Sequence, residues 1–321
     1  MDTRPILLKG QHPIETGNYY LPTNDIIELY AVVNRWISNR SPGGIVYGRP
    51  RLGKTRAISY LEVYLQHEFG ENLPIFKMYC SHHKPNENRF YTDLLRDIGH
   101  SAFNVGKVEA KRDRLIKFLI ERAESYGHHR IVLFIDDAQM LYEQDYNWFM
   151  DIYNQLDRYG ITFTVILVGQ EELLHQKSAF ISAAQMQIIG RFMVHEHKFS
   201  GIKSTEDLKM CLHGYDDTSE YPANSGWSFT RYFFPEAFEE GMRFANEAQI
   251  IIDKFKEVRS KANIRGKIEI PMQYITLTVD NCMKIFGANG KGVHWPSISN
   301  WEEAINSSGY IEAEIYNSMF K

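Results

Sequence analysis

The segment from Gly48 to Thr55 reads G-R-P-R-L-G-K-T, and it limits the possible folds more than any other part of the chain. The apolar run at residues 44–47, directly before it, has the length and composition of a buried strand. Residues 56–61, directly after it, have the pattern of a helix start. The two glycines allow the backbone to curl, so that successive N–H groups point inward at the positive end of that helix. The pattern predicts a phosphate-binding loop between a strand and a helix.

Such a loop predicts a nucleoside triphosphate ligand, with ATP and Mg²⁺ as the expected cofactors. The Lys54 ammonium is expected at the β- and γ-phosphates, and the Thr55 hydroxyl is expected on the Mg²⁺ ion. The complete set of predicted nucleotide-binding residues is Gly48, Arg51, Leu52, Gly53, Lys54, Thr55 and Arg56.

A second apolar run, residues 131–135, ends in the carboxylates of Asp136 and Asp137. The run predicts a strand that is buried on both faces. Asp136 is then expected to hold the Mg²⁺ through its waters, beside Thr55. Asp137 is expected to orient or deprotonate the attacking water. In an alternative interpretation both residues cap a helix that starts at Ala138, because Asp favours helix starts. The two interpretations are compatible.

The formal net charge of −4 argues against a protein that coats nucleic acid with its whole surface. Any DNA contact must therefore come from a local basic patch. The sequence has no run of about 18 apolar residues, which predicts no membrane helix, and its start lacks the pattern of a signal peptide. Three widely spaced cysteines predict reduced thiols and a cytoplasmic location. Cys80, His82 and His83 lack the further ligands that a structural zinc site needs.

The order of the predicted elements indicates three regions: an irregular arm at 1–23, an α/β domain at 24–200 and a helical region at 201–321. Strands alternating with helices predict a doubly wound parallel sheet. This layout is typical of an AAA+ ATPase core followed by a helical lid, in which neighbouring subunits complete the site. Strands are expected at 44–47, 73–79, 131–137, 161–168 and 192–199, and helices at 24–37, 89–98, 108–125, 139–159, 178–189, 205–213, 235–259, 271–286 and 297–306, with loop at 214–234.

Two further catalytic positions follow from this layout. Gln170, after the fourth strand, is expected to contact the γ-phosphate, although a turn residue or a helix cap would also fit there. Arg191 is expected to act as an arginine finger on a neighbouring subunit, and the alternative is a surface arginine in a salt bridge. Arg231 is a weaker candidate for a lid arginine, because the aromatic residues around it fit either packing or a partner surface.

The best local basic cluster lies at residues 107–117. On a helical wheel Lys107, Lys111 and Arg114 share one face, so these three residues are the predicted DNA contacts. The alternative is a solvated helix face. In that case Lys84 and Arg89 are the next candidates.

Five motifs together resemble the TnsC/TniB-type AAA+ regulators of bacterial transposons. They are G-R-P-R-L-G-K-T, F-Y-T-D-L-L-R-D-I-G-H at 90–100, F-I-D-D-A-Q at 134–139, L-V-G-Q-E-E-L at 167–173 and G-R-F at 190–192. The similarity spans roughly residues 20–200, and Y-F-F-P at 232–235 also looks related. The ATPase motifs specify only the superfamily, whereas the 90–99 segment and the motif order point to the transposition branch. Asp137 stands where Glu is common in the family, which implies slow hydrolysis.

The resemblance implies a homo-oligomer that polymerises on double-stranded DNA with ATP, as a ring or filament. It also implies a TniQ-like target-selection protein at one end, a transposase at the other, and no membrane partner. Two alternatives remain: a helicase-loader or initiator-like AAA+ ATPase, and a P-loop small-molecule kinase. A kinase should carry a compact acceptor pocket and an arginine-rich lid, and the predicted helical region here is long and poor in arginine.

Overall fold

The computed structural model describes residues 3–125 and 127–319, which divide into two compact units. One unit, here called the helical unit, contains the chain up to Ile27, Arg51–Gly53 and the chain from Ser200 onward. The other, here called the sheet unit, contains Glu28–Pro50 and Lys54–Phe199. Each unit has its own cluster of buried hydrophobic side chains, so each is described by itself.

The sheet unit is built on five parallel strands in the order β2-β3-β4-β1-β5. β1 pairs with β4 on one side and with β5 on the other, so that Ile45 lies between Leu167 and Glu196. The predicted doubly wound parallel sheet is confirmed. The strands are β1 (Gly43–Tyr47), β2 (Ile75–Tyr79), β3 (Arg130–Asp136), β4 (Thr162–Gly169) and β5 (His195–Lys198).

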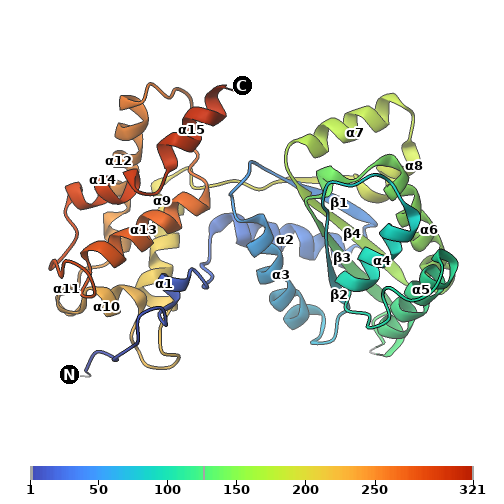
Figure 1. The fold of residues 1–321 in the computed structure, drawn as a ribbon, viewed down its shortest axis with the longest axis horizontal. Coiled ribbons are helices and arrows are strands. Elements are labelled where there is room, and N and C mark those ends of the chain that lie inside the picture. Colours follow the sequence, from blue (N-terminus) through green and yellow to red (C-terminus); the bar gives the residue numbers. More distant parts are fainter. Residues whose placement is uncertain (1–2, 126, 320–321) are drawn as a thin grey trace. The chain divides into compact units, whose positions relative to one another are not determined.

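Helices cover both faces of this sheet. Figure 1 shows α2 and α3 on one side and α4, α5 and α6 on the other. The division follows from right-handed crossovers, since the chain runs from β1 to β2 in one direction and back towards β5 in the other. Strands covered on both faces need apolar side chains throughout, and β4 is buried at every position after Thr162. The helices are α2 (Asn24–Ser38), α3 (Lys54–Phe69), α4 (Glu87–Asp97), α5 (Val108–Ser125), η1 (Ala138–Met140), α6 (Glu143–Arg158), α7 (Glu172–Ser182) and α8 (Met186–Phe192).

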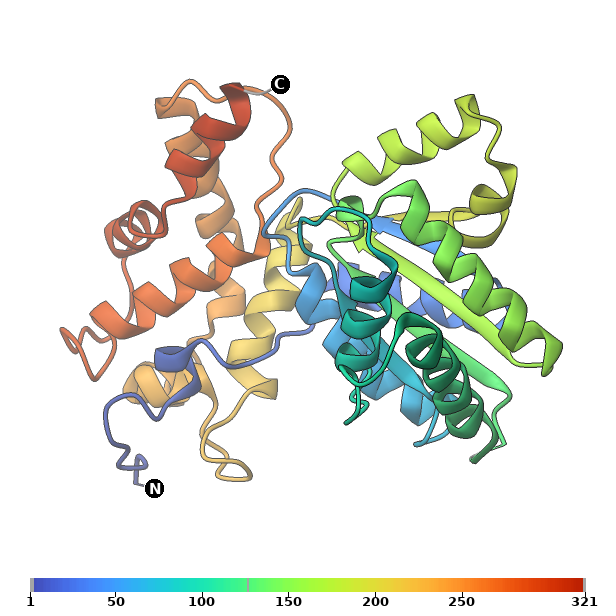
Figure 2. The ribbon, with the colours of Figure 1, turned by 45° about the vertical axis from the view of Figure 1, so that its right-hand side comes forward.

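The helical unit packs its helices around a core rich in aromatic side chains, including the fully buried Trp301, Tyr215 and Phe244. The N-terminal arm packs on this unit, as Figure 2 shows, and the His12 ring stacks on Tyr232 with their centroids 4.6 Å apart. The elements are α1 (Pro13–Thr16), α9 (Thr205–His213), η2 (Gly214–Thr218), α10 (Phe229–Phe233), α11 (Pro235–Glu239), η3 (Phe244–Glu247), α12 (Ala248–Lys261), α13 (Met272–Phe286), α14 (Ile298–Asn306) and α15 (Tyr310–Met319).

Several predicted helices differ from those observed. The single helix expected at 235–259 is three elements, α11, η3 and α12, with Gly241 in the left-handed region between the first two. The helix expected at 178–189 is α7 and α8, which are separated at Ala184, another left-handed residue. The loop expected at 214–234 contains η2 and α10, and α15 was not predicted. Within 3–125 and 127–319, no helix is both long enough and apolar enough to cross a bilayer.

Candidate nucleotide site

The carboxyl ends of three adjacent strands carry the predicted catalytic groups. β4 lies between β1 and β3, so the loop after β1, Gln170 after β4 and Asp136 at the end of β3 lie along one edge of the sheet. Ligands of open α/β sheets bind outside this edge. The strand order therefore brings together, in the sheet unit, residues that are more than 80 positions apart in sequence.

Lys54 is the first residue of α3, and its ammonium points back into the loop. It donates hydrogen bonds of 2.7 Å to the carbonyl oxygens of Gly48 and of Arg49. Burial lowers the pKa of Lys54 to about 8, although the Asp136 and Asp137 carboxylates favour its charged form. The loop thus holds a half-buried ammonium at the start of a helix, where the backbone N–H groups and the helix dipole also favour an anion.

The middle of the loop, Arg51–Gly53, belongs to the helical unit. Arg51 and Gly53 both have left-handed backbone conformations, with φ of 66° and 97°, which turn the loop sharply. Leu52 is buried, and the Arg51 guanidinium forms a hydrogen bond with the Tyr274 hydroxyl and lies 5.7 Å from the centroid of that ring. Arg56 is exposed on the first turn of α3. The Leu52 side chain therefore has a packing role, whereas the Leu52 backbone, Arg51 and Arg56 remain predicted nucleotide contacts.

The predicted metal ligands lie side by side. The Thr55 hydroxyl donates a 2.6 Å hydrogen bond to Asp136 Oδ2, and Asp136 Oδ1 accepts one of 3.0 Å from the Asp137 N–H. Burial raises the pKa of the Asp136 carboxyl, and the hydrogen bond from Thr55 opposes that shift. A hydroxyl and a carboxylate in contact are hard oxygen ligands, which Mg²⁺ prefers. The donor set fits this ion.

Asp137 and Gln170 are linked through a residue that the sequence did not single out, Gln139. Its amide Nε2 donates to Asp137 Oδ1 at 3.0 Å, and its Oε1 accepts from the Gln170 N–H at 3.1 Å. Asp137 has a left-handed backbone, which Asp tolerates, and its side chain makes no hydrogen bond that caps η1. The capping alternative is therefore wrong for this side chain. The only signal for Gln139 was its place at the end of F-I-D-D-A-Q.

Arg191 lies near the end of α8 and contacts α6. It donates to Asn154 Oδ1 at 3.1 Å, and its guanidinium lies 5.3 Å from the centroid of the Tyr153 ring. Both partners are neutral, whereas the alternative interpretation expected an acidic partner in a salt bridge. Action on a neighbouring subunit stays a prediction.

The predicted basic face of α5 must be corrected for Lys111. Its side chain is only 2% exposed, and its ammonium donates to Asn88 Oδ1 at 2.9 Å and to Thr92 Oγ1 at 2.8 Å. Both partners belong to α4, and a helical wheel of α5 does not show where α4 lies. Arg114 donates to the carbonyl oxygens of residues 102 and 105, whereas Lys107 is exposed. The three side chains therefore do not form one exposed face.

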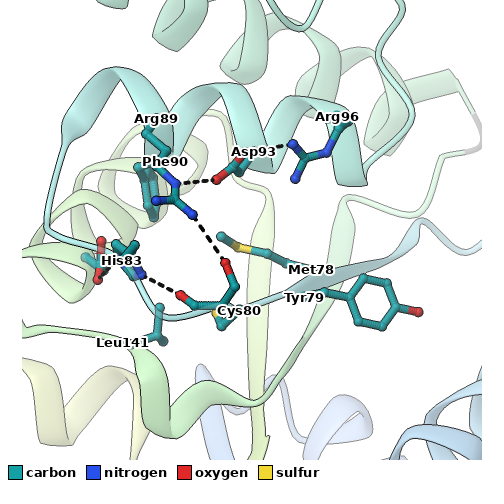
Figure 3. A pocket seen from close by; sticks show the side chains of 11 residues that line it. Met78, Tyr79, Cys80, His83, Arg89, Phe90, Asp93, Arg96 and Leu141 are labelled. Atoms are coloured by element: carbon teal, nitrogen blue, oxygen red, sulfur yellow. Dashed lines mark hydrogen bonds and ion pairs between the residues drawn. The ribbon is translucent and has the colours of Figure 1, made fainter.

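A polar cavity of about 210 Å³ lies beside the end of β2 and is lined from α4 and α6 (Figure 3). Within it His83 Nε2 lies 3.0 Å from the buried carboxylate of Asp145. Arg89 is bonded to Asp93 at 3.2 Å, so part of its charge is compensated. Among residues 3–125 and 127–319, no group of three or more His, Cys, Asp or Glu side chains is arranged to hold a metal. Lys84, on the loop before α4, is exposed.

The aromatic segment around Arg231 belongs to the core of the helical unit. Trp227, Tyr232 and Phe233 are each at most 5% exposed, so the packing interpretation is correct for them. The Arg231 guanidinium lies 2.7 Å from the Glu239 carboxylate and 4.5 Å from the centroid of the Trp227 ring.

Comparisons with known proteins agree with this geometry. A family model described as an AAA domain matches residues 39–176, and no curated protein matches the sequence. The ORC2 protein of Aeropyrum pernix, solved in ADPNP–ADP complexes, is 14% identical with a TM-score of 0.60, over 92% of this chain and 72% of that chain. ORC of Drosophila, solved bound to DNA, is 11% identical with a TM-score of 0.50, over 95% of this chain and 69% of that chain. The chain has the AAA+ P-loop NTPase fold, similar to that of the ORC2 protein, with a helical C-terminal region.

Proposed function

We propose that the protein binds ATP with Mg²⁺ and hydrolyses it. The observation that carries this proposal is the contact of Thr55 with Asp136 beside the Lys54 ammonium, at the carboxyl edge of the sheet. Thr55 and Asp136 would hold the ion, which neutralises charge on the transferring phosphoryl group when bound. Asp137 would orient the attacking water, and Gln170 would contact the γ-phosphate. An arginine from a second copy, Arg191, would complete the site.

We further propose that ATP drives assembly of several copies on double-stranded DNA, as an initiator-like or loader-like AAA+ protein. The similarity in fold to ORC, one example of which was solved on DNA, supports this choice. A single acidic chain attracts a duplex weakly, so contacts from several copies would have to add together. With Lys111 buried, the exposed residues Lys84, Arg89 and Lys107 are the proposed contacts.

The resemblance of residues 90–100 to TnsC/TniB-type regulators supports a second, narrower candidate function. In it the assembly links a target-selection protein to a transposase. Phe90, Tyr91, Leu94 and Leu95 of this segment are buried in the sheet-unit core, so they carry the resemblance through packing rather than through an exposed contact. The resemblance alone therefore supports transposition as the process in which the assembly acts.

Electron microscopy with sizing chromatography tests the main proposal. The protein is mixed with duplex DNA and either a non-hydrolysable ATP analogue, ADP or no nucleotide. Rings or filaments that need both DNA and the ATP analogue support the proposal. Discrete monomers under every condition, with nucleotide bound, contradict it and favour the kinase alternative. Stimulation of the assembled form's ATPase by a co-expressed transposase would favour the narrower function.

A further inference from the structure

The Gln139 side-chain amide forms hydrogen bonds with a donor and with an acceptor at the same time. Its Oε1 faces the Gln170 N–H, which can only donate, and its Nε2 faces the Asp137 carboxylate, which can only accept when ionised. Only one orientation of the amide satisfies both groups. A movement of the main chain at Gln170 therefore changes the hydrogen bond that Asp137 receives.

The main chain around Gln139 is fixed from a different direction. Gln176, on α7, donates through Nε2 to the carbonyl oxygens of Gln139 and Leu141, at 2.8 and 3.1 Å. The Tyr146 hydroxyl, on a fully buried ring, donates in turn to Gln176 Oε1 at 3.1 Å. With its backbone held in this way, Gln139 can respond to Gln170 only through its side chain.

Gly169 makes room for the amide. A Cβ atom at this position would lie 2.3 Å from Gln139 Oε1 and 2.8 Å from Leu173 Cδ1. Both distances are far shorter than a van der Waals contact. Any larger residue at the end of β4 would displace Gln139 from the Gln170 N–H.

We propose that Gln139 is a positioning residue, which sets the Asp137 carboxylate according to the position of the strand end that bears Gln170. The inference rests on the proposed ATP hydrolysis and deepens it. Asp137 is exposed and one methylene shorter than Glu, so its carboxylate has few other supports. Coupling the phosphate-contacting end of β4 to this carboxylate would orient the attacking water only when the γ-phosphate holds Gln170 in place. A displaced catalytic group costs about 100-fold in rate.

The test compares steady-state ATP hydrolysis and nucleotide affinity of the full chain with those of two variants. Gln139→Ala removes the whole bridge, and Gln139→Glu keeps its length and the acceptor for the Gln170 N–H but removes the donor to Asp137. Both should lower kcat about 10- to 100-fold while the Kd for ATP and the KM change less than about 2-fold. Gln185→Ala, at a half-exposed glutamine bonded to Glu143, is the matched control and should keep full activity.

A double-mutant cycle separates positioning from a general structural effect. Gly169→Ala alone should lower kcat about as much as Gln139→Ala, and adding it to Gln139→Ala should lower kcat by less than about 3-fold more. If the two losses in kcat multiply, the two positions act independently and the inference is overturned. An unchanged kcat in Gln139→Glu would also overturn it. This variant is the closest in shape to the wild type, so it keeps the test valid if Gln139→Ala unfolds. Wild-type protein that binds ATP but never hydrolyses it would overturn the proposed function, and the inference with it. Normal wild-type turnover with unaffected variants would overturn the inference alone.

Discussion

Acidification from pH 7 to pH 5 should destabilise the helical unit through one residue, His12. Its ring is 1% exposed and lies among aromatic side chains, and its Nδ1 accepts a 3.1 Å hydrogen bond from the Ile14 N–H. Burial, with a smaller contribution from the Arg4 guanidinium, lowers its pKa from 6.5 to about 4. Protonation would also remove the acceptor that caps α1.

The sign follows from the two pKa values. The folded pKa lies below the unfolded one, so the unfolded chain takes up the proton first as the pH falls. The contribution of His12 is therefore fully present above pH 6.5 and is lost progressively as the pH falls towards 4. Between pH 7 and pH 5 the loss in unfolding free energy is about 2 kcal/mol.

Denaturant unfolding at several pH values, followed by tryptophan fluorescence, measures this loss. Three tryptophans, Trp227, Trp295 and Trp301, lie in the helical unit and report on it. His12→Phe keeps an aromatic ring, cannot ionise, and loses the α1 cap at every pH. Its unfolding free energy should fall about 2 kcal/mol less than that of the wild type between pH 7 and pH 5. Equal falls in the two proteins would refute the reasoning.

Further predictions concern the nucleotide and DNA. Lys54→Ala should weaken ATP binding by at least about 2 kcal/mol in calorimetry, because it removes a half-buried ammonium from the phosphates, and wild-type affinity would contradict the loop assignment. Arg191→Ala should leave binding by dilute protein intact but lower turnover about 10³-fold, and turnover that is independent of protein concentration would argue against action on a neighbour. The double substitution Lys84→Glu and Lys107→Glu should abolish DNA-stimulated assembly and spare ATP binding. Lys111→Met, in contrast, should lower the melting temperature and leave DNA binding unchanged. Changing either exposed lysine to Ala should make the slope of log affinity against log salt shallower by about 0.9. An unchanged slope would contradict a phosphate contact by that lysine.

Sequence reasoning predicted those candidate site residues that belong to local motifs. Lys54, Thr55 and Asp136 follow or end buried strands, and parallel pairing alone is enough to bring such positions to one edge. Gln139 was missed because its role depends on Gln170, which a different strand presents, and on space at a glycine. No local pattern contains those contacts.

The basic cluster shows the opposite failure. A helical wheel places Lys111 with Lys107, but it does not show which neighbouring helix covers that face. α4 supplies Asn88 and Thr92, two neutral acceptors at hydrogen-bond distance. Their hydrogen bonds offset part of the free energy that burial of the ammonium costs. Breaks inside predicted helices, as at Ala184, depend on single left-handed residues that helical periodicity does not register.

The order of the strands also affects how the protein is made. Both neighbours of β1 come from much later in the chain: Gly43 pairs with Val165, and Gly44 with His195. During synthesis the first strand therefore waits for about 120 further residues before either neighbour exists, and contacts so distant in sequence form slowly. The nucleotide loop that follows β1 is thus encoded early but acquires its supporting sheet late. A nascent chain should become able to retain ATP only after β4 has left the ribosome, which makes nucleotide capture a late marker of correct folding.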